Sequence, residues 1–161
     1  MEDLKFMDEA LALAAEAAQE GEVPVGCVIV RDGRIVGRGR NRRETDKTAL
    51  GHGEIEAIAD ACKTLGGWRL WDCTLYVTLE PCPMCAGAII NARIPRVVYG
   101  ASDAKFGAVR SVCSLFDMRF NHHPQVEAGI REAEAAALMT EFFQNLRVEL
   151  RSRPKWKPKE N

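Results

Sequence analysis

Two short motifs constrain this chain more than any other feature of its sequence. The first reads H-x-E and places His52 two residues before Glu54, and the second reads P-C-x-x-C and contains Cys82 and Cys85. One imidazole and two thiolates at this spacing can supply three ligands to a zinc ion. Three protein ligands leave a fourth coordination position for water, which is typical of a catalytic rather than a structural site. The pattern therefore predicts a chain that folds around a catalytic metal.

Glu54 is the natural proton shuttle of such a site, because it lies beside a metal ligand without being one. Metal ligation lowers the pKa of water from about 15.7 to about 7, so a hydroxide nucleophile exists at neutral pH. Taken alone, a C-x-x-C pair can be a redox pair, half of a zinc knuckle or two buried small side chains. The two motifs together favour a catalytic zinc, since a redox pair needs no H-x-E and a structural site needs a fourth Cys or His. The other histidines, His122 and His123, lie in a predicted loop far downstream.

The composition is that of a soluble globular domain, with 47% hydrophobic and 28% charged residues in a chain of 161. A net charge of −1 and a pI near 6.3 predict no strong global attraction to nucleic acid, so any such binding must come from a local patch. Six cysteines without an apolar leader segment favour a reduced, cytoplasmic protein. No apolar run approaches the roughly 20 residues of a membrane span, so we expect no membrane partner.

Hydrophobic periodicity predicts strands that alternate with helices, which argues for a three-layer α/β/α domain over residues 1–150. Both motifs lie where predicted helices begin, at the edge where open α/β sheets usually bind ligands and where the helix dipole favours a thiolate. The basic segment 151–161 is expected to be a flexible C-terminal tail. Polar, aperiodic stretches predict loops at 41–51 and 102–124. Helices are expected at 2–19, 52–65, 82–92 and 132–150, and strands at 25–30, 34–40, 73–79, 96–101 and 125–129.

Longer stretches of the sequence resemble the bacterial tRNA-specific adenosine deaminases, a branch of the cytidine deaminase-like superfamily. The T-L-E-P-C-x-M-C segment at 78–85 is shared across that superfamily, and H-x-E with P-C-x-x-C is the established signature of zinc-dependent nucleobase deaminases. The P-V-G segment at 24–26, the pair Asn121-His122 and the pair Phe142-Phe143 are more particular to the tRNA branch. The resemblance runs from about residue 3 to about residue 150. It implies hydrolytic deamination of the wobble adenosine of a tRNA anticodon to inosine.

The resemblance also implies an architecture and roles for individual residues. The fold is a cytidine deaminase-like α/β/α domain with a central five-stranded mixed sheet, usually a homodimer. One zinc ion per chain is bound by His52, Cys82 and Cys85, while Glu54 takes a proton from the zinc water and returns it to the base ring and the leaving ammonia. The family's contacts with the base and with the tRNA anticodon stem-loop fall on Asn41, Val25, Asp103, Lys105, Asn121 and His122.

Without the resemblance these contact residues have simpler interpretations. Asn41 would be a turn residue, and Val25 an ordinary core residue. Asp103 and Lys105 would be solvated loop charges, and His122 an ordinary surface histidine.

Several departures from the family pattern keep a second function open. Gly53 stands where the family usually has Ala, and residues 48–51 read T-A-L-G where D-P-T-A is common. The alternative is a deaminase of a free nucleobase or nucleoside, of guanine or cytosine type, on the same scaffold. Arginines and lysines between Arg147 and Lys159 favour the tRNA substrate, since a basic end can contact phosphates even on an acidic protein. A zinc-stabilised binding module without catalysis is a third hypothesis, but Glu54 argues against it.

Overall fold

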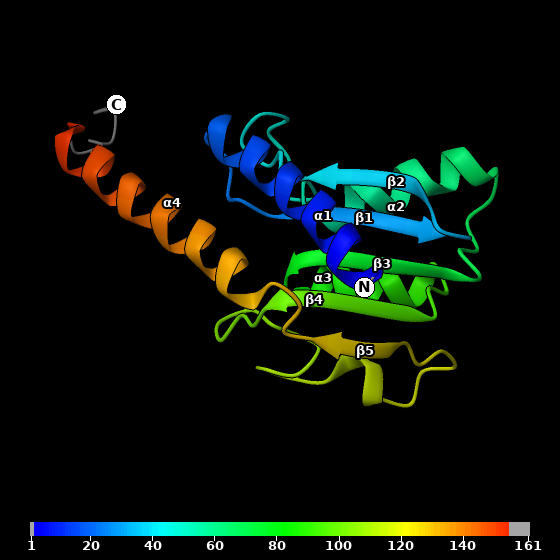
Figure 1. The fold of residues 1–161 in the computed structure, drawn as a ribbon. Helices are drawn as coiled ribbons and strands as arrows, with labels where there is room; N and C mark the ends of the chain where they lie inside the picture. The colour runs from blue at the N-terminus through cyan, green and yellow to red at the C-terminus, as the bar shows by residue number, and fades with distance from the viewer. Residues whose placement is uncertain (1, 155–161) are drawn as a thin grey trace, which may run out of the picture.

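A five-stranded mixed sheet forms the middle layer of the computed structural model, which describes residues 2–154 (Figure 1). The strands are β1 (Gly26–Arg31), β2 (Arg34–Arg40), β3 (Cys73–Leu79), β4 (Arg96–Ala101) and β5 (Gln125–Ala128). Their order across the sheet is β2-β1-β3-β4-β5. Strand β1 is antiparallel to both β2 and β3, whereas β3, β4 and β5 are mutually parallel. The predicted five-stranded mixed sheet is therefore confirmed.

Four α-helices cover the two faces of this sheet (Figure 1). They are α1 (Glu2–Gln19), α2 (Gly53–Leu65), α3 (Pro83–Asn91) and α4 (Glu132–Ser152). Helix α1 packs on one face, and α4 contacts both α1 and β4 on that side, while α2 and α3 pack on the other. The C-terminal half of α4 extends beyond the sheet (Figure 1). Of the helices within residues 2–154, none has the length and apolarity that crossing a bilayer demands.

Alternation along the strands explains the three layers. On the α1 side, Val28 and Tyr76 pack against Phe6 and Met7. Their neighbours in sequence point the other way, so that residues such as Val77 join the larger core beneath α2 and α3. Successive side chains of a strand lie on opposite faces, so strands buried on both sides read as the nearly continuous apolar runs seen in this sequence.

The predicted element boundaries agree with the structure to within two residues, and the largest difference is at the end of α4. This helix continues through Ser152, past the expected domain limit at residue 150. The Ser152 hydroxyl donates to the carbonyl of Glu149, and Arg153 pairs with the Glu149 carboxylate, so the last turn is supported. Pro154 is the first residue that disfavours a helix. The predicted flexibility of the tail concerns mostly residues 155–161, which lie outside the described residues.

Gly26 allows α1 to lie directly on β1. A Cβ atom at this position would collide with the backbone carbonyl of Ala10 and the backbone nitrogen of Ala14, both on α1. The backbone of a helix cannot yield as the tip of a flexible side chain can, so any side chain here must push α1 away from the sheet.

We predict that Gly26→Ala lowers the free energy of unfolding by about 2 to 3 kcal/mol, because overpacking separates α1 from β1. Urea denaturation of the purified protein measures this loss. Gly67→Ala is the matched control, since an added Cβ there meets no atom within 4 Å. Equal midpoints for wild type and Gly26→Ala would contradict the close approach of the two backbones.

Candidate active site

The predicted site residues lie at the same end of four neighbouring strands. Val25 precedes β1, Asn41 follows β2, Cys82 lies shortly after β3 and Asp103 follows β4. Strand β1 begins where β2 ends, because Gly26 is paired with Arg40. Strands β3 and β4 are antiparallel to β1, so they finish at the end of the sheet where β1 begins. Residues far apart in the sequence thus lie close together, as expected for a ligand crevice of an α/β sheet.

The potential metal ligands occupy the N-termini of two helices. His52 caps α2 and Cys82 caps α3, with Pro83 at the first helical position, where its missing N–H is of no consequence. The Nδ1 atom of His52 lies 3.5 Å from the Cys82 sulfur and 3.6 Å from the Cys85 sulfur. All three donor atoms lie within 4.8 Å of one another. Such a cluster could hold a metal ion.

The two cysteines of this cluster have opposite pKa shifts. A hydrogen bond from the Cys85 thiol, aided by one from His52, lowers the pKa of Cys82 to about 4. The same hydrogen bond to Cys82, together with burial, raises the pKa of Cys85 well above its ordinary value. The hydrogen bond with Cys82 also raises the pKa of His52. One thiolate is therefore present at neutral pH, and a bound cation would stabilise the second.

Glu54 lies in the first turn of α2, next to the cluster of His52, Cys82 and Cys85, and its side chain is almost completely buried. Burial raises the pKa of Glu54 to about 7, and the nearby Cys82 thiolate adds to this rise. A carboxyl group with a pKa near the pH of the cell can both accept and return a proton, as a general acid–base catalyst must. The geometry thus places a proton-transfer group beside the cluster.

A cavity of about 520 Å³ opens over His52, Glu54 and Cys82. Its volume is in the range of ordinary small-molecule sites. The cavity combines mostly apolar walls with a few polar groups, which suits a flat, partly polar ligand. The residues that line the cavity besides these three are Val23, Val25, Asn41, Arg43, Ala49, Leu79, Glu80, Pro83, Met84, Asp103, Phe106, Met139 and Phe143.

Asn41 is buried at the cavity wall, and its side chain is fixed by the backbone. Its Oδ1 atom accepts a hydrogen bond of 3.1 Å from the N–H of Gly53, and its own N–H donates to the carbonyl of Val25. With Oδ1 engaged, the Nδ2 group is the part of the carboxamide left to donate to a ligand. Asn41 therefore links the start of α2 to the binding cavity.

The structure brings some of the other predicted contact residues to the cavity and leaves others away from it. Asp103 lines it, and its Oδ1 accepts hydrogen bonds from the backbone N–H groups of Lys105 and Phe106. Lys105 is exposed on the same turn but is not part of the wall. Asn121 and His122 precede β5, at the end of the strands away from the cavity. There His122 Nε2 lies 2.7 Å from the carbonyl oxygen of Ile94. Their contact with RNA stays a prediction.

Several wall residues were missed by the reasoning from sequence. Met139 and Phe143 of α4 contribute to the cavity, and their i, i+4 spacing places them on one helix face. Arg43 and Met84 gave no signal of their own. Glu80 could have been noticed beside the P-C-x-x-C motif, because a carboxylate inside an apolar run needs a partner.

Comparison with known proteins agrees with this geometry. A family model described as MafB19-like deaminase matches residues 1–147, which include the whole donor cluster and Glu54. The chain belongs to this deaminase family.

Curated relatives and a solved structure cover most of the deaminase. It is 52% identical over 143 residues to a tRNA-specific adenosine deaminase of Streptococcus pyogenes serotype M1, which covers 88% of this chain and 84% of that protein. It is 46% identical over 147 residues to a tRNA-specific adenosine deaminase of Bacillus subtilis strain 168, with 91% of each covered. A solved structure from a study of A-to-I editing by tRNA:A34 deaminases matches with a TM-score of 0.81 and 47% identity, covering 83% of this chain and 98% of that one.

We predict that the purified deaminase contains about one metal ion per chain, and that Cys85→Ser loses most of it because one of three protein ligands is removed. Elemental analysis of the dialysed proteins measures the metal content. Cys113→Ser is the matched control, since Cys113 is an exposed cysteine outside the cluster. A Cys85→Ser protein with wild-type metal content would contradict the assignment of the ligands.

Proposed function

We propose that this deaminase converts the wobble adenosine of a tRNA anticodon to inosine by hydrolysis. Water adds oxygen at C6 of the purine, and the amino group leaves as ammonia. The observation that carries the proposal is the joint placement of the His52, Cys82 and Cys85 donor atoms and the buried Glu54 at one cavity. This site lies in a chain about half identical, over most of its length, to tRNA-specific adenosine deaminases.

The metal is proposed to be zinc, one ion per chain, held by His52, Cys82 and Cys85. One nitrogen and two sulfur donors form a ligand set that zinc accepts readily. Nitrogen and sulfur donors at ordinary zinc bond lengths on a tetrahedron lie about 3.6 Å apart. The distances of 3.5 and 3.6 Å from His52 Nδ1 to the two sulfurs fit this spacing. When bound, zinc lowers the pKa of a coordinated water to about 7 and so supplies hydroxide at neutral pH.

Glu54 is proposed to carry the protons of the reaction. Its carboxylate takes a proton from the attacking water and delivers it to the ring nitrogen N1. It then moves the remaining proton of the new C6 hydroxyl to the amino group, which leaves as ammonia while the C6 carbonyl forms. Burial and a pKa of about 7 support this role, because the group is close to balance between its two protonation states at neutral pH. The buried position also keeps bulk water from competing for these protons.

Asn41 and Val25 are proposed to position the base. The Nδ2 group of Asn41 can donate to a ring nitrogen of the purine, because Oδ1 is already held by the N–H of Gly53. Val25 and Leu79 belong to the apolar part of the wall and can pack against the faces of the ring. Burial of the flat base against apolar side chains excludes bulk water from the site and leaves only the attacking water molecule at the reacting carbon.

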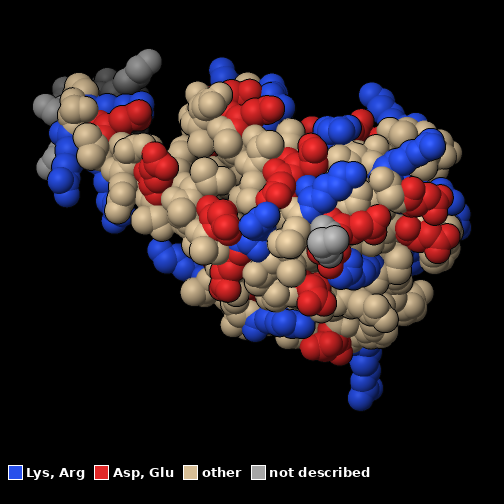
Figure 2. Space-filling model, in the orientation of Figure 1, with Lys and Arg blue, Asp and Glu red and all other residues tan. Residues whose placement is uncertain are grey.

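The proposed partner is the anticodon stem-loop, which presents an unpaired base and so avoids the few kcal/mol needed to extrude a base from a duplex. Figure 2 shows both signs of charge interspersed over the face that carries α1 and α4, in keeping with the net charge of −1. Phosphate contacts must therefore be local. Arg43 at the cavity, Lys105 and Asp103 on the neighbouring turn, and the predicted pair Asn121-His122 are the proposed RNA contacts.

The deaminase is further proposed to be a cytoplasmic homodimer that contacts its partner through α3. This helix is apolar along almost all its length, yet Gly87 and Ala88 are only partly buried, and nothing lies within 4 Å of a Cβ built on Gly87. A helix that is apolar all round is usually covered on every side.

We predict that Glu54→Gln keeps the fold and the metal but lowers kcat by about 100- to 10,000-fold, because positioned proton transfer is lost. Ammonia release from a stem-loop substrate measures the rate. Glu56→Gln is the matched control on the same helix, since Glu56 does not line the cavity. Near-normal turnover by Glu54→Gln would remove this residue from the mechanism.

We predict that a stem-loop with adenosine at the wobble position is deaminated efficiently and free adenosine poorly, since free adenosine lacks the phosphate contacts. Binding of the stem-loop should weaken as the salt concentration rises, because contacts with phosphates release counterions. Asn41→Ala should reduce kcat/KM for the stem-loop by about 10-fold or more, because it removes the hydrogen bond from Nδ2 to the base and the one that Oδ1 accepts from the Gly53 N–H. Efficient turnover of free guanine or cytosine, with the stem-loop left unmodified, would favour the free-base alternative.

A further inference from the structure

Two buried glutamates lie near the end of the strands where the cavity opens, and they take no part in the proposed chemistry. Glu22 precedes β1 and Glu80 follows β3, and each side chain is only 2% exposed. Neither belongs to the metal-ligand cluster. A buried carboxylate is stable only if its oxygens are hydrogen-bonded or paired with a cation.

Glu80 binds the loop that follows β4. Its Oε2 atom accepts hydrogen bonds from the backbone N–H groups of Val109, Arg110 and Ser111, at 3.2, 2.9 and 3.0 Å. Its Oε1 atom accepts from the N–H of Asp103 and from the hydroxyl of Ser111. Five donors from one loop therefore converge on one side chain.

The loop also approaches Glu80 at its glycine. A Cβ atom on Gly107 would collide with the Glu80 carboxylate, so the backbone of the loop and the carboxylate are in direct contact. The part of the loop held in this way carries Asp103 and Phe106, both of which line the cavity.

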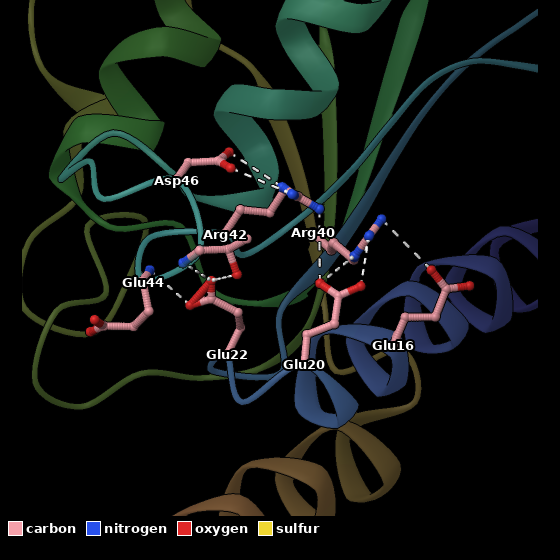
Figure 3. Close-up of polar contacts among 8 residues, drawn as sticks. Glu16, Glu20, Glu22, Arg40, Arg42, Glu44 and Asp46 are labelled. Carbon is pink, nitrogen blue, oxygen red and sulfur yellow. Dashed lines mark hydrogen bonds and ion pairs between the residues drawn. The ribbon is translucent and has the colours of Figure 1, made fainter.

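Glu22 binds the loop that follows β2 in a similar manner (Figure 3). Its Oε1 atom accepts from the N–H of Glu44 at 2.9 Å, and its Oε2 atom accepts from the N–H and the hydroxyl of Thr45, both at 3.1 Å. This loop, residues 41–51, carries Asn41, Arg43 and Ala49 of the cavity wall and leads into His52.

Figure 3 also shows a second layer of contacts outside Glu22, at the surface. Glu20 pairs with Arg40 at 2.8 Å and with Arg42 at 3.8 Å, and Arg42 pairs with Asp46. The side chains of Glu20 and Asp46 are 37% and 40% exposed. Exposed ion pairs of this kind contribute roughly 0 to 1 kcal/mol, whereas charge-assisted hydrogen bonds to a buried carboxylate are stronger and more restrictive.

We propose that Glu22 and Glu80 are positioning residues that hold the two loops flanking the cavity, and thereby set the binding geometry of the substrate without reacting with it. The inference rests on the proposed deaminase function for its substrate, but on geometry alone for the hydrogen bonds that Glu22 and Glu80 make with the two loops. Glu80 joins the loop after β4 to the end of β3, and Glu22 joins the loop after β2 to the segment between α1 and β1. Glu22 holds the loop that carries Asn41, and Glu80 holds the loop that carries Asp103 and Phe106.

Replacement by glutamine keeps the size of each side chain and changes what it can accept. One carboxylate oxygen becomes an NH2 group, which faces backbone N–H groups that are themselves donors. Unpaired buried donors are unfavourable, so the loop must move away. Glu20→Gln is the matched control, because it makes the same charge change two residues from Glu22 and affects only surface ion pairs.

The expected result is a change in KM more than in kcat. Glu22→Gln and Glu80→Gln should raise KM for the wobble-adenosine stem-loop by about 10-fold, an equivalent of about 1.4 kcal/mol, and change kcat less than about 3-fold. Metal content should stay at the wild-type level, and Glu20→Gln should resemble wild type. If wild type deaminates a free base or nucleoside instead, the proposed function fails, and the same KM comparison is made with that substrate.

Hydrogen–deuterium exchange gives a second measurement that does not depend on activity. Glu80→Gln should speed exchange of the amides of residues 103–111 by about 10-fold and leave 43–49 unchanged, and Glu22→Gln should do the reverse. Ser111→Ala, which removes one of five donors, should give a smaller effect of the same kind if Glu80→Gln does not fold. Unchanged loop exchange, or a wild-type KM with only a lower melting temperature, would overturn the proposal. Loss of metal with a fall in kcat alone would also overturn it, because the effect would then act through Cys82.

Discussion

The convergence of His52, Cys82 and Cys85 imposes the strictest geometric demand on this fold. The three donor atoms come from the N-termini of two helices that are separated in sequence by a whole strand. Two helices can begin side by side only if the segments before them leave the sheet at the same edge. The insertion of β1 between β2 and β3 satisfies this condition, because β2 and β3 then run in the same direction on either side of it. The connection from β2 to α2 and that from β3 to α3 consequently open onto one cavity.

The sheet and the clustering of His52, Cys82 and Cys85 could be predicted from the sequence because both depend on local patterns. Apolar runs mark β1, β3 and β4, and the two motifs lie at helix starts, with Pro83 in the first turn of α3. Asn41, by contrast, could be placed only by resemblance. The orientation of its side chain depends on the N–H of Gly53, a contact between loop and helix that no periodicity encodes.

The remaining parts of the site depend on tertiary contacts. Met139 and Phe143 reach the cavity because α4 packs against the sheet on the side of α1, which no pattern within residues 132–152 reveals. The hydrogen bonds of Glu22 and Glu80 join residues more than twenty positions apart. The resemblance also gave Asn121 and His122 a role in RNA binding, which stays a prediction; parallel pairing of β5 with β4 places both residues before β5, at the end of the strands away from the cavity.

Glu54 and Glu80 show how hydrogen-bond donors decide what a buried carboxylate can do. Both side chains are almost fully buried at the same cavity. Burial raises the pKa of Glu54 to about 7, because it outweighs the hydrogen bond from the residue's own backbone N–H and because the Cys82 thiolate repels the charge of the carboxylate. Burial also opposes the ionisation of Glu80, but the Ser111 hydroxyl and the backbone N–H groups of the loop outweigh it and hold the pKa of Glu80 below its usual range. Glu80 therefore stays charged and anchors a loop, whereas Glu54 remains able to exchange a proton with a ligand in the cavity.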